Sequence, residues 1–219
     1  LLGQSIVVDN RAGGNGTIGA EAMIRSAPDG HTLLMTTASV TSINMVTYAK
    51  PPYDTLRDML PLSPVMTTGS LIVLHPSMPV KNLKELLALL RAKPGALDFG
   101  SAGFGSSTHM ALALFTYLGK FKVTHVPYKG TAPALTDTVA GQVHGVFANI
   151  LSGLPYVKSG RLRAQGVSGA KRSAVLPDLP TIAESGVAGY ETTTWHGWLA
   201  PTGTPGPVIN KLHTELSRA

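Results

Sequence analysis

Cysteine is absent from the 219 residues, which excludes disulfide bonds and is compatible with a periplasmic or a cytosolic protein. Charged residues make up only 14% and aromatic residues only 6% of the chain, whereas 43% of the residues are hydrophobic. The longest apolar runs, such as residues 86–90, are far shorter than the roughly 20 residues that a membrane-spanning helix needs. We therefore expect a soluble globular protein that does not insert into the membrane and contains one large or two modest domains.

Clustered charge is also missing. Eighteen lysines and arginines face twelve aspartates and glutamates, giving a formal net charge of +6, but only Lys171 and Arg172 are adjacent. Proteins that bind nucleic acids usually show a stripe of such residues together with aromatic side chains. We expect no nucleic-acid partner, and a mild positive field that attracts anionic ligands.

Short apolar runs alternate with helical patterns along the whole chain, which predicts an α/β fold with largely parallel sheets. The clearest helix starts after Asn82, a suitable N-cap, and its leucines recur at the spacing of a single buried face. Thr131 is expected to cap a helix, and Thr181 and Glu184 match a capping box. The expected strands are residues 5–8, 32–36, 71–74, 97–99, 122–126, 143–147, 162–167 and 195–200. The expected helices are residues 17–26, 83–93, 108–118, 131–141 and 154–158, with a last one opened by residues 204–205.

Residues 14–19 spell G-x-G-x-x-G between an expected strand and an expected helix. A dinucleotide site of this type also needs an acidic residue about 20 positions further on. Residues 35–43 contain no acidic residue, so a tight strand-to-helix loop is the better interpretation. We expect no cofactor.

The segment 100–107 resembles a phosphate-binding loop, but Ser106 stands where the lysine of that motif is required. Nucleotide hydrolysis is therefore not expected. Glycines allow the backbone to approach a ligand, and the N-terminus of the helix that follows favours an anion. The hydroxyl groups of Ser101, Ser106, Ser107 and Thr108 could donate to a carboxylate; an ordinary serine-capped helix is the alternative.

A hydrolase of small esters, with Ser106 as nucleophile and a histidine such as His109 as base, is the alternative from another functional class. The G-x-S-x-G elbow is missing, because Ser107 and Thr108 follow Ser106. Three positions apart on one helix, the two side chains are poorly placed to act as nucleophile and base. The histidines do not show the H-x-x-x-H or H-E-x-x-H spacing, so no metal site is expected.

Five groups of short strings, in the same order, resemble the Bug receptors, the solute-binding proteins of tripartite tricarboxylate transporters. The resemblance covers essentially all 219 residues. Its most distinctive string is His-Val-Pro-Tyr-Lys-Gly at residues 125–130, followed by Pro-Ala-Leu at 133–135 and by Asp137. The other strings are residues 3–4 with 8–16 and 27–34, residues 176–181 with 184–186, residues 195–197, and residues 200–205.

This resemblance implies a periplasmic binding protein fold of type II, with two α/β lobes and a ligand cleft between them. Lobe one is expected at residues 1–98 plus 197–219, and lobe two at residues 99–196. The family captures small organic carboxylates in the periplasm, closes by a hinge and is recognised by membrane subunits of the transporter. It is not a family of enzymes. The ligand-binding residues carried over are Ser101, Gly103, Gly105, Ser106, Ser107, Thr108, Tyr128 and Asn149 from lobe two, with Ser39, Thr41 and Trp195 as further candidates.

The resemblance also implies further segments before residue 1 and after residue 219, so the chain is expected to be truncated at both ends. A fragment without independent function is a third interpretation. No string in the sequence indicates which carboxylate is bound.

Overall fold

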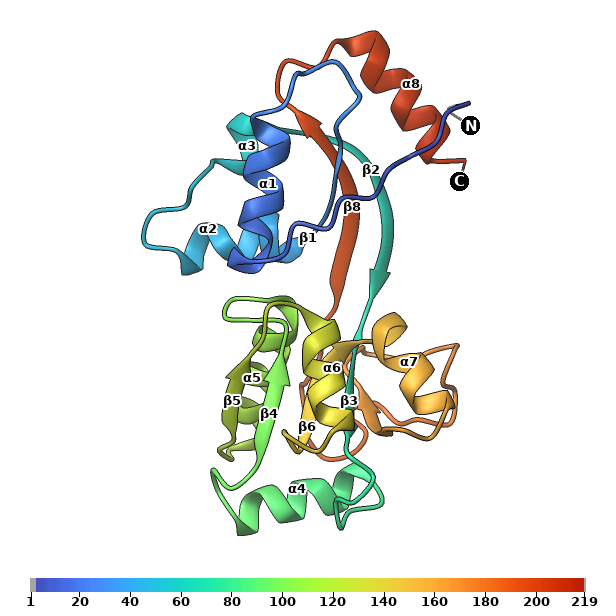
Figure 1. Cartoon of the computed structure of the whole chain (residues 1–219). Helices are drawn as coiled ribbons and strands as arrows, with labels where there is room; N and C mark the ends of the chain where they lie inside the picture. Colours follow the sequence, from blue (N-terminus) through green and yellow to red (C-terminus); the bar gives the residue numbers. More distant parts are fainter. Residues whose placement is uncertain (1–2, 219) are drawn as a thin grey trace. The chain divides into compact units, whose positions relative to one another are not determined.

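The computed structural model describes residues 3–218, which form two compact units. The first unit is Leu1–Thr67 with Thr194–Ala219, and the second is Thr68–Thr193. The chain therefore passes from one unit to the other twice, near residues 67–68 and 193–194 (Figure 1).

A five-stranded mixed sheet, with strand order β5-β4-β6-β3-β7, organises the second unit. Strand β4 runs parallel to β5 and β6, whereas β3 runs antiparallel to β6 and β7. The strands are β3 (Ser70–Leu74), β4 (Asp98–Ser101), β5 (Thr124–Pro127), β6 (Gly145–Asn149) and β7 (Arg163–Val167). Because β4, β5 and β6 are parallel, their carboxyl ends lie at one edge of the sheet.

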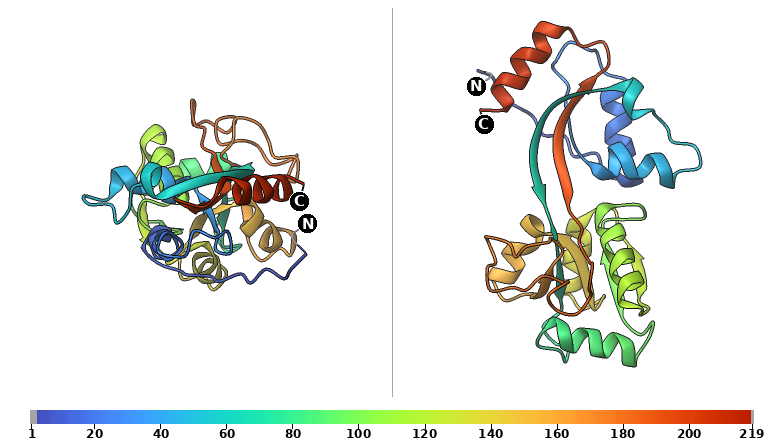
Figure 2. Two further views of the ribbon diagram at one scale, coloured as in Figure 1. Left: turned by 90° about the horizontal axis from the view of Figure 1, so that it is seen from above. Right: turned by 180° about the vertical axis from the view of Figure 1, so that it is seen from behind.

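Helices pack on both faces of this sheet (Figures 1 and 2). The side chains of β3 join the apolar clusters on the two faces alternately. Ile72 and Leu74 join the apolar cluster of α4 (Leu83–Ala92) and α5 (Ser107–Gly119). Leu71 and Val73 join the cluster of α6 (Thr131–Val139) and α7 (Ile150–Lys158). All five residues of β3 are buried, which explains why this strand reads as a continuous apolar run.

The first unit contains a three-stranded sheet of order β1-β8-β2. Its strands are β1 (Leu34–Thr37), β2 (Met59–Thr68) and β8 (Thr194–Pro201), and β1 is antiparallel to β8. On β8, Leu199 packs with α1 (Thr17–Ile24), and Ala200 packs with α8 (Gly206–Leu216). The shorter helical segments are η1 (Gly14–Gly16), η2 (Ser39–Ile43), α2 (Asn44–Thr47) and α3 (Thr55–Asp58).

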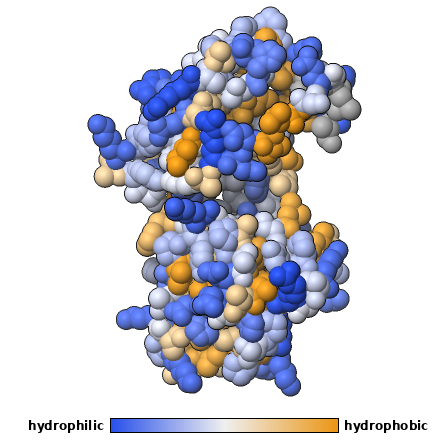
Figure 3. Space-filling model, in the orientation of Figure 1, coloured by the Kyte–Doolittle hydropathy of each residue, from blue (hydrophilic) through white to orange (hydrophobic). Residues whose placement is uncertain are grey.

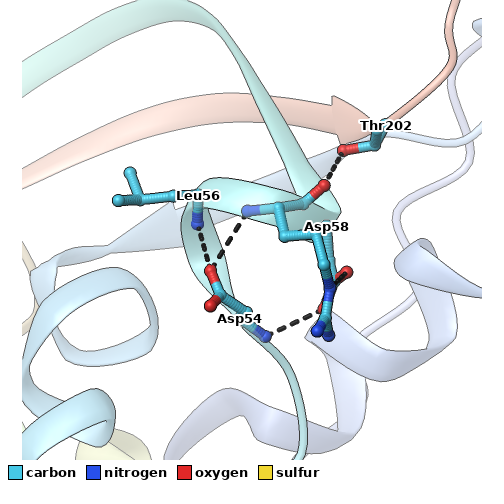
Figure 4. Close-up of polar contacts among 5 residues, drawn as sticks. Asp54, Leu56, Asp58 and Thr202 are labelled. Atoms are coloured by element: carbon cyan, nitrogen blue, oxygen red, sulfur yellow. Dashed lines mark hydrogen bonds and ion pairs between the residues drawn. The ribbon is translucent and has the colours of Figure 1, made fainter.

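A closed set of hydrogen bonds holds the one-turn helix α3 at the start of β2 (Figure 4). The Asp54 carboxylate accepts from the N–H groups of Leu56 and Arg57, and the Asp58 carboxylate accepts from the N–H of Asp54. The Arg57 guanidinium and this N–H lower the pKa of Asp58 to about 2. Thr202 ties the turn to the end of β8 by donating to the Arg57 carbonyl at 2.6 Å.

The two compact units divide the chain differently from the expected lobes. Residues 68–98, expected in lobe one, belong to the second unit, because β3 lies between β6 and β7 in its sheet and α4 packs on its core. The second passage is near residues 193–194 rather than 196–197, because β8 begins at Thr194.

Three local expectations were wrong. Residues 5–8 form no strand, and the side chains of Ile6, Val7 and Val8 are 68%, 88% and 76% exposed. Strand β2 was missed because Pro61 and Pro64 lower the strand propensity of its sequence. Gly130, not Thr131, is the N-cap residue of α6.

The capping box of Thr181 and Glu184 does form, with N–H to side-chain distances of 2.9 and 3.0 Å, but it closes a turn rather than a helix. Across residues 3–218, every helix is too short or too polar to span a bilayer. On the face of the second unit drawn in Figure 3, hydrophilic residues are interspersed with small apolar groups.

Candidate functional site

The loop from β4 to α5 lies at the edge of the second unit's sheet where three parallel strands end. Ser101 is the last residue of β4, Tyr128 follows β5 directly, and Asn149 is the last residue of β6. Ligands of open α/β sheets bind outside the carboxyl ends of parallel strands. The structure therefore brings together all eight candidates predicted for lobe two, six of which lie within residues 101–108.

Glycine is required in this loop for two reasons. Gly103 and Gly105 have φ angles of +126° and +72°, which L-residues rarely adopt. A Cβ atom at Gly103 would also lie 2.9 Å from the carbonyl oxygen of Tyr128. The loop backbone therefore packs directly against the segment that follows β5.

The hydroxyl groups of the loop hold its conformation. Ser106 caps α5 by accepting the His109 N–H at 3.1 Å, and it donates to the Gly103 carbonyl at 2.7 Å. Thr108 accepts the Ala102 N–H at 2.9 Å. Ser106 and Thr108 are 3% and 1% exposed, so both hydroxyls are internal to the loop. What they leave for a ligand is the partial positive charge of the first turn of α5.

Tyr128 and Asn149 differ in what they can offer a ligand. The Tyr128 hydroxyl donates to the Asp137 carboxylate at 2.9 Å, and burial together with this carboxylate raises the pKa of Tyr128 to about 12. Tyr128 is therefore a neutral phenol, and its hydroxyl proton is already donated to Asp137. The Asn149 Oδ1 atom, by contrast, is buried and has no hydrogen-bond partner among residues 3–218.

Two histidines that are not among the predicted ligand-binding residues lie against the loop. The His125 Nε2 atom is 2.6 Å from the Ser101 Oγ atom, and the His109 Nδ1 atom accepts the Gly105 N–H at 3.1 Å. Their rings are stacked, with centroids 4.1 Å apart, and the ring of Phe104 meets both edge-on. The His-Val-Pro-Tyr string contained His125, but only the fold could reveal its neighbour on α5.

This arrangement does not support the alternative of a serine hydrolase. Ser106 bonds the backbone N–H of His109, and the imidazole of His109 is turned to Gly105 instead. Ser101 does meet a histidine, but Ser101 is fully buried. Within the described part of the chain, no carboxylate forms an ion pair with His125 that would orient it as a base.

The remaining candidates belong to the first unit. Ser39 is buried at the start of η2, two residues after the end of β1. The Thr41 hydroxyl is 3.4 Å from the Thr37 carbonyl oxygen. Trp195, on β8, is 37% exposed. Their role in ligand binding stays a prediction.

The G-x-G segment of the first unit is a tight turn into α1, but residues 5–8 before it are not a strand. Tyr48 donates to the Gly14 carbonyl at 2.9 Å, and the side chain of Asn15 donates to Asn44 at 2.7 Å. These hydrogen bonds tie the turn to residues 44 and 48. Residues 3–218 bring no three histidine, aspartate or glutamate side chains together as a metal site.

Comparison with protein families gives one description for the whole chain. A family model described as the tripartite tricarboxylate transporter family receptor matches residues 1–219. The UPF0065 protein in the tcbD-tcbE intergenic region of Pseudomonas sp. (strain P51) is 38% identical over all of this chain and 65% of its own length. BugT of Bordetella pertussis is 34% identical over all of this chain and 67% of its own length. The chain thus spans about two thirds of these relatives.

Solved structures show the same fold. The structure described as R. palustris Rpa4515 with adipate has a TM-score of 0.95 at 36% identity, covering 98% of this chain and 72% of that one. MatC (Rpa3494) from Rhodopseudomonas palustris, with bound malate, has a TM-score of 0.86 at 32% identity, covering 94% of this chain and 70% of that one. The periplasmic binding protein BugD has a TM-score of 0.93 at 33% identity, covering 98% of this chain and 72% of its own. The expected fold of periplasmic solute-binding proteins is confirmed.

Proposed function

Since this chain belongs to the receptor family of tripartite tricarboxylate transporters, we propose that it is a periplasmic solute-binding receptor for a small organic carboxylate. One carboxylate group of the ligand lies at the loop 102–106 and the N-terminus of α5. The observation that carries this proposal is a glycine-containing loop at the carboxyl ends of the parallel strands, which leads into α5 with Ser106 as its N-cap.

The charge distribution and the small residues of the loop support a carboxylate at this position. Residues 101–108 contain no acidic side chain, so nothing in the loop repels an anion. The dipole of the 13-residue helix α5 places partial positive charge at its first turn. Because positions 103 and 105 are glycine, no side chain there keeps the loop backbone away from the ligand.

The named ligands of two relatives suggest the chemical class. Rpa4515 was solved with adipate and MatC with malate, and both ligands are dicarboxylates. For this chain we propose a dicarboxylate of similar size, with Asn149 as a further polar contact in the second unit. Ser39, Thr41 and Trp195 remain our candidates for contacts from the first unit.

The proposed role involves binding and release without turnover. The ligand-bound conformation is stabilised by contacts that the ligand makes in that state alone, and membrane subunits of the transporter recognise it. The pair Ser106 and His109 is not arranged as nucleophile and base, because Ser106 accepts the backbone N–H of His109 and the His109 imidazole accepts the N–H of Gly105.

Titration calorimetry and thermal melts with adipate and malate test the proposal, with adipamide as the uncharged control of the same length. At about 100 times its dissociation constant, a ligand should raise the free energy of unfolding by about 2.7 kcal/mol. We expect a saturable effect of at least one acid and none of adipamide. A cooperative melt unaffected by either acid, or steady hydrolysis of a small ester, would contradict the receptor proposal.

A further inference from the structure

The stacked rings of His109 and His125 contact the loop at both of its ends. His125 contacts Ser101, where β4 ends, and His109 contacts Gly105, directly before the N-cap of α5. The two imidazole rings lie almost parallel, at an angle of 14°. Phe104, between the two glycines, is 69% exposed and packs its ring against both histidines. The loop is therefore held from two strands and one helix at once.

One of these contacts depends on the protonation state of the ring. Gly105 donates its backbone N–H to the Nδ1 atom of His109, so this nitrogen must carry a lone pair. An imidazolium has protons on both nitrogens and cannot accept. When His109 is protonated, the hydrogen bond from Gly105 is lost, because the N–H of Gly105 then faces the N–H of the imidazolium Nδ1 atom. The two N–H groups repel each other, so Gly105 must move away.

The surroundings of the rings favour the neutral forms. The groups facing them are the Ser101 hydroxyl, the Phe104 ring, the Gly105 N–H and the other imidazole. No carboxylate within residues 3–218 lies at ion-pair distance from either ring, and His109 is the titratable group that acts on His125. Burial lowers the pKa of His109, and burial together with His109 lowers the pKa of His125 to about 4. The first turn of α5 adds further positive potential.

We propose that His109 and His125 are positioning residues for the carboxylate loop, and that the loop keeps its ligand-binding conformation while both rings are neutral. Ligand affinity then decreases on acidification. The part that concerns affinity rests on the proposed function, whereas the part that concerns the loop does not.

That affinity decreases, rather than increases, on acidification follows from proton linkage. The ordered loop holds the histidines at lowered pKa values, whereas a loop released from the rings lets them return towards 6.5. The ordered loop thus binds fewer protons. Its stability is fully present above about pH 6.5 and decreases as the pH falls from there towards about 4, the pKa of His125. Each proton taken up weakens binding by at most about tenfold per pH unit.

The variant H109N distinguishes the role of His109 as a hydrogen-bond acceptor from the effect of its protonation. The Oδ1 atom of asparagine takes the place of the imidazole Nδ1 atom as an acceptor, but the amide does not titrate. The dissociation constant for adipate would be measured between about pH 7.5 and about pH 5. We expect H109N to stay within about threefold of the unsubstituted chain at the higher pH and to have a shallower slope on acidification. H109F, which lacks the acceptor, should bind at least about tenfold more weakly at the higher pH.

The matched control is H144N. His144 Nδ1 also accepts a backbone N–H, that of Asp98 at 3.0 Å, but at the opposite end of β4. H144N should keep the original pH dependence, and the titration of adipate itself is common to all variants. An H109N slope equal to that of the unsubstituted chain would overturn the proposal.

A measurement without ligand keeps the two proposals separate. The amide resonance of Gly105, followed by NMR as the pH is lowered, should shift in the unsubstituted chain and remain constant in H109N. If no acid binds at any pH but the Gly105 signal titrates, the proposed function fails and the histidine positioning stands. A Gly105 signal that ignores pH throughout overturns the positioning proposal.

Discussion

Gly103 shows at the scale of one residue how backbone geometry limits the side chain that the loop can accept. Its φ of +126° already disfavours a side chain, and a methyl group there would collide with the Tyr128 carbonyl oxygen at 2.9 Å. A main-chain carbonyl cannot rotate away as the end of a flexible side chain can. The residue therefore sets how closely the loop and the segment after β5 approach each other.

The substitution Gly103→Ala should displace the loop and weaken adipate binding by at least about tenfold, because ordering the loop again costs more than about 1.4 kcal/mol. Calorimetric titration measures this change. The matched control is Gly186→Ala, with a similar φ of +116° but an ordinary contact of 3.7 Å to Leu87. This control should lose comparable backbone stability and keep its affinity; equal losses of affinity in both variants would count against a steric role of Gly103.

At the scale of one element, α4 shows how local sequence determines a helix. Asn82 accepts the Glu85 N–H at 3.0 Å, and Glu85 reaches back to the Lys81 N–H at 2.7 Å. Its leucines 83, 86, 87 and 90 are all at most 2% exposed in the core of the second unit. Burying one such side chain contributes about 1.5–3 kcal/mol. Cap and apolar stripe are both readable from the sequence.

Replacing the cap by Asn82→Ala should reduce the free energy of unfolding by about 1 kcal/mol, because the Glu85 N–H loses its partner. Urea denaturation followed by circular dichroism measures it, with Asn82→Ser as the control that retains a capping oxygen. Adipate affinity should not change, because α4 follows β3, which runs antiparallel to β6 and so ends at the opposite edge of the sheet. A loss of affinity in a folded variant would contradict this placement of the site.

At the scale of the whole molecule, the excess of positive charge is spread along the chain. The formal net charge is +6, and it creates a field that attracts an anionic solute before contact. Attraction of this kind acts on the rate of association, whereas the contacts in the loop set the rate of dissociation.

The association rate constant for adipate should therefore fall several-fold when ionic strength rises from about 0.01 M to about 0.15 M, because the Debye length falls from about 30 Å to about 8 Å. Stopped-flow fluorescence measures both rate constants, and the dissociation rate should remain nearly constant. If salt changed mainly the dissociation rate, short-range contacts rather than the overall field would be responsible.

The sequence alone determined the features that depend on neighbouring residues. The cap and stripe of α4, the apolar run of β3, and the glycines and Ser106 before α5 could all be predicted, because caps, periodicity and left-handed backbone act over a few residues. The ordered strings also indicated the receptor family, which the match over residues 1–219 confirms.

Only the tertiary structure decided the features that depend on contacts between segments distant in the sequence. The stacking of His109 on His125 joins α5 to β5, and the bond from Tyr128 to Asp137 joins the end of β5 to α6. Residues 5–8 look like a strand but pair with no other strand within residues 3–218. Residues 68–98 belong to the second unit because β3 pairs with β6 and β7. Strand pairing and side-chain stacking are contacts across sequence distance, and local propensity contains no information about them.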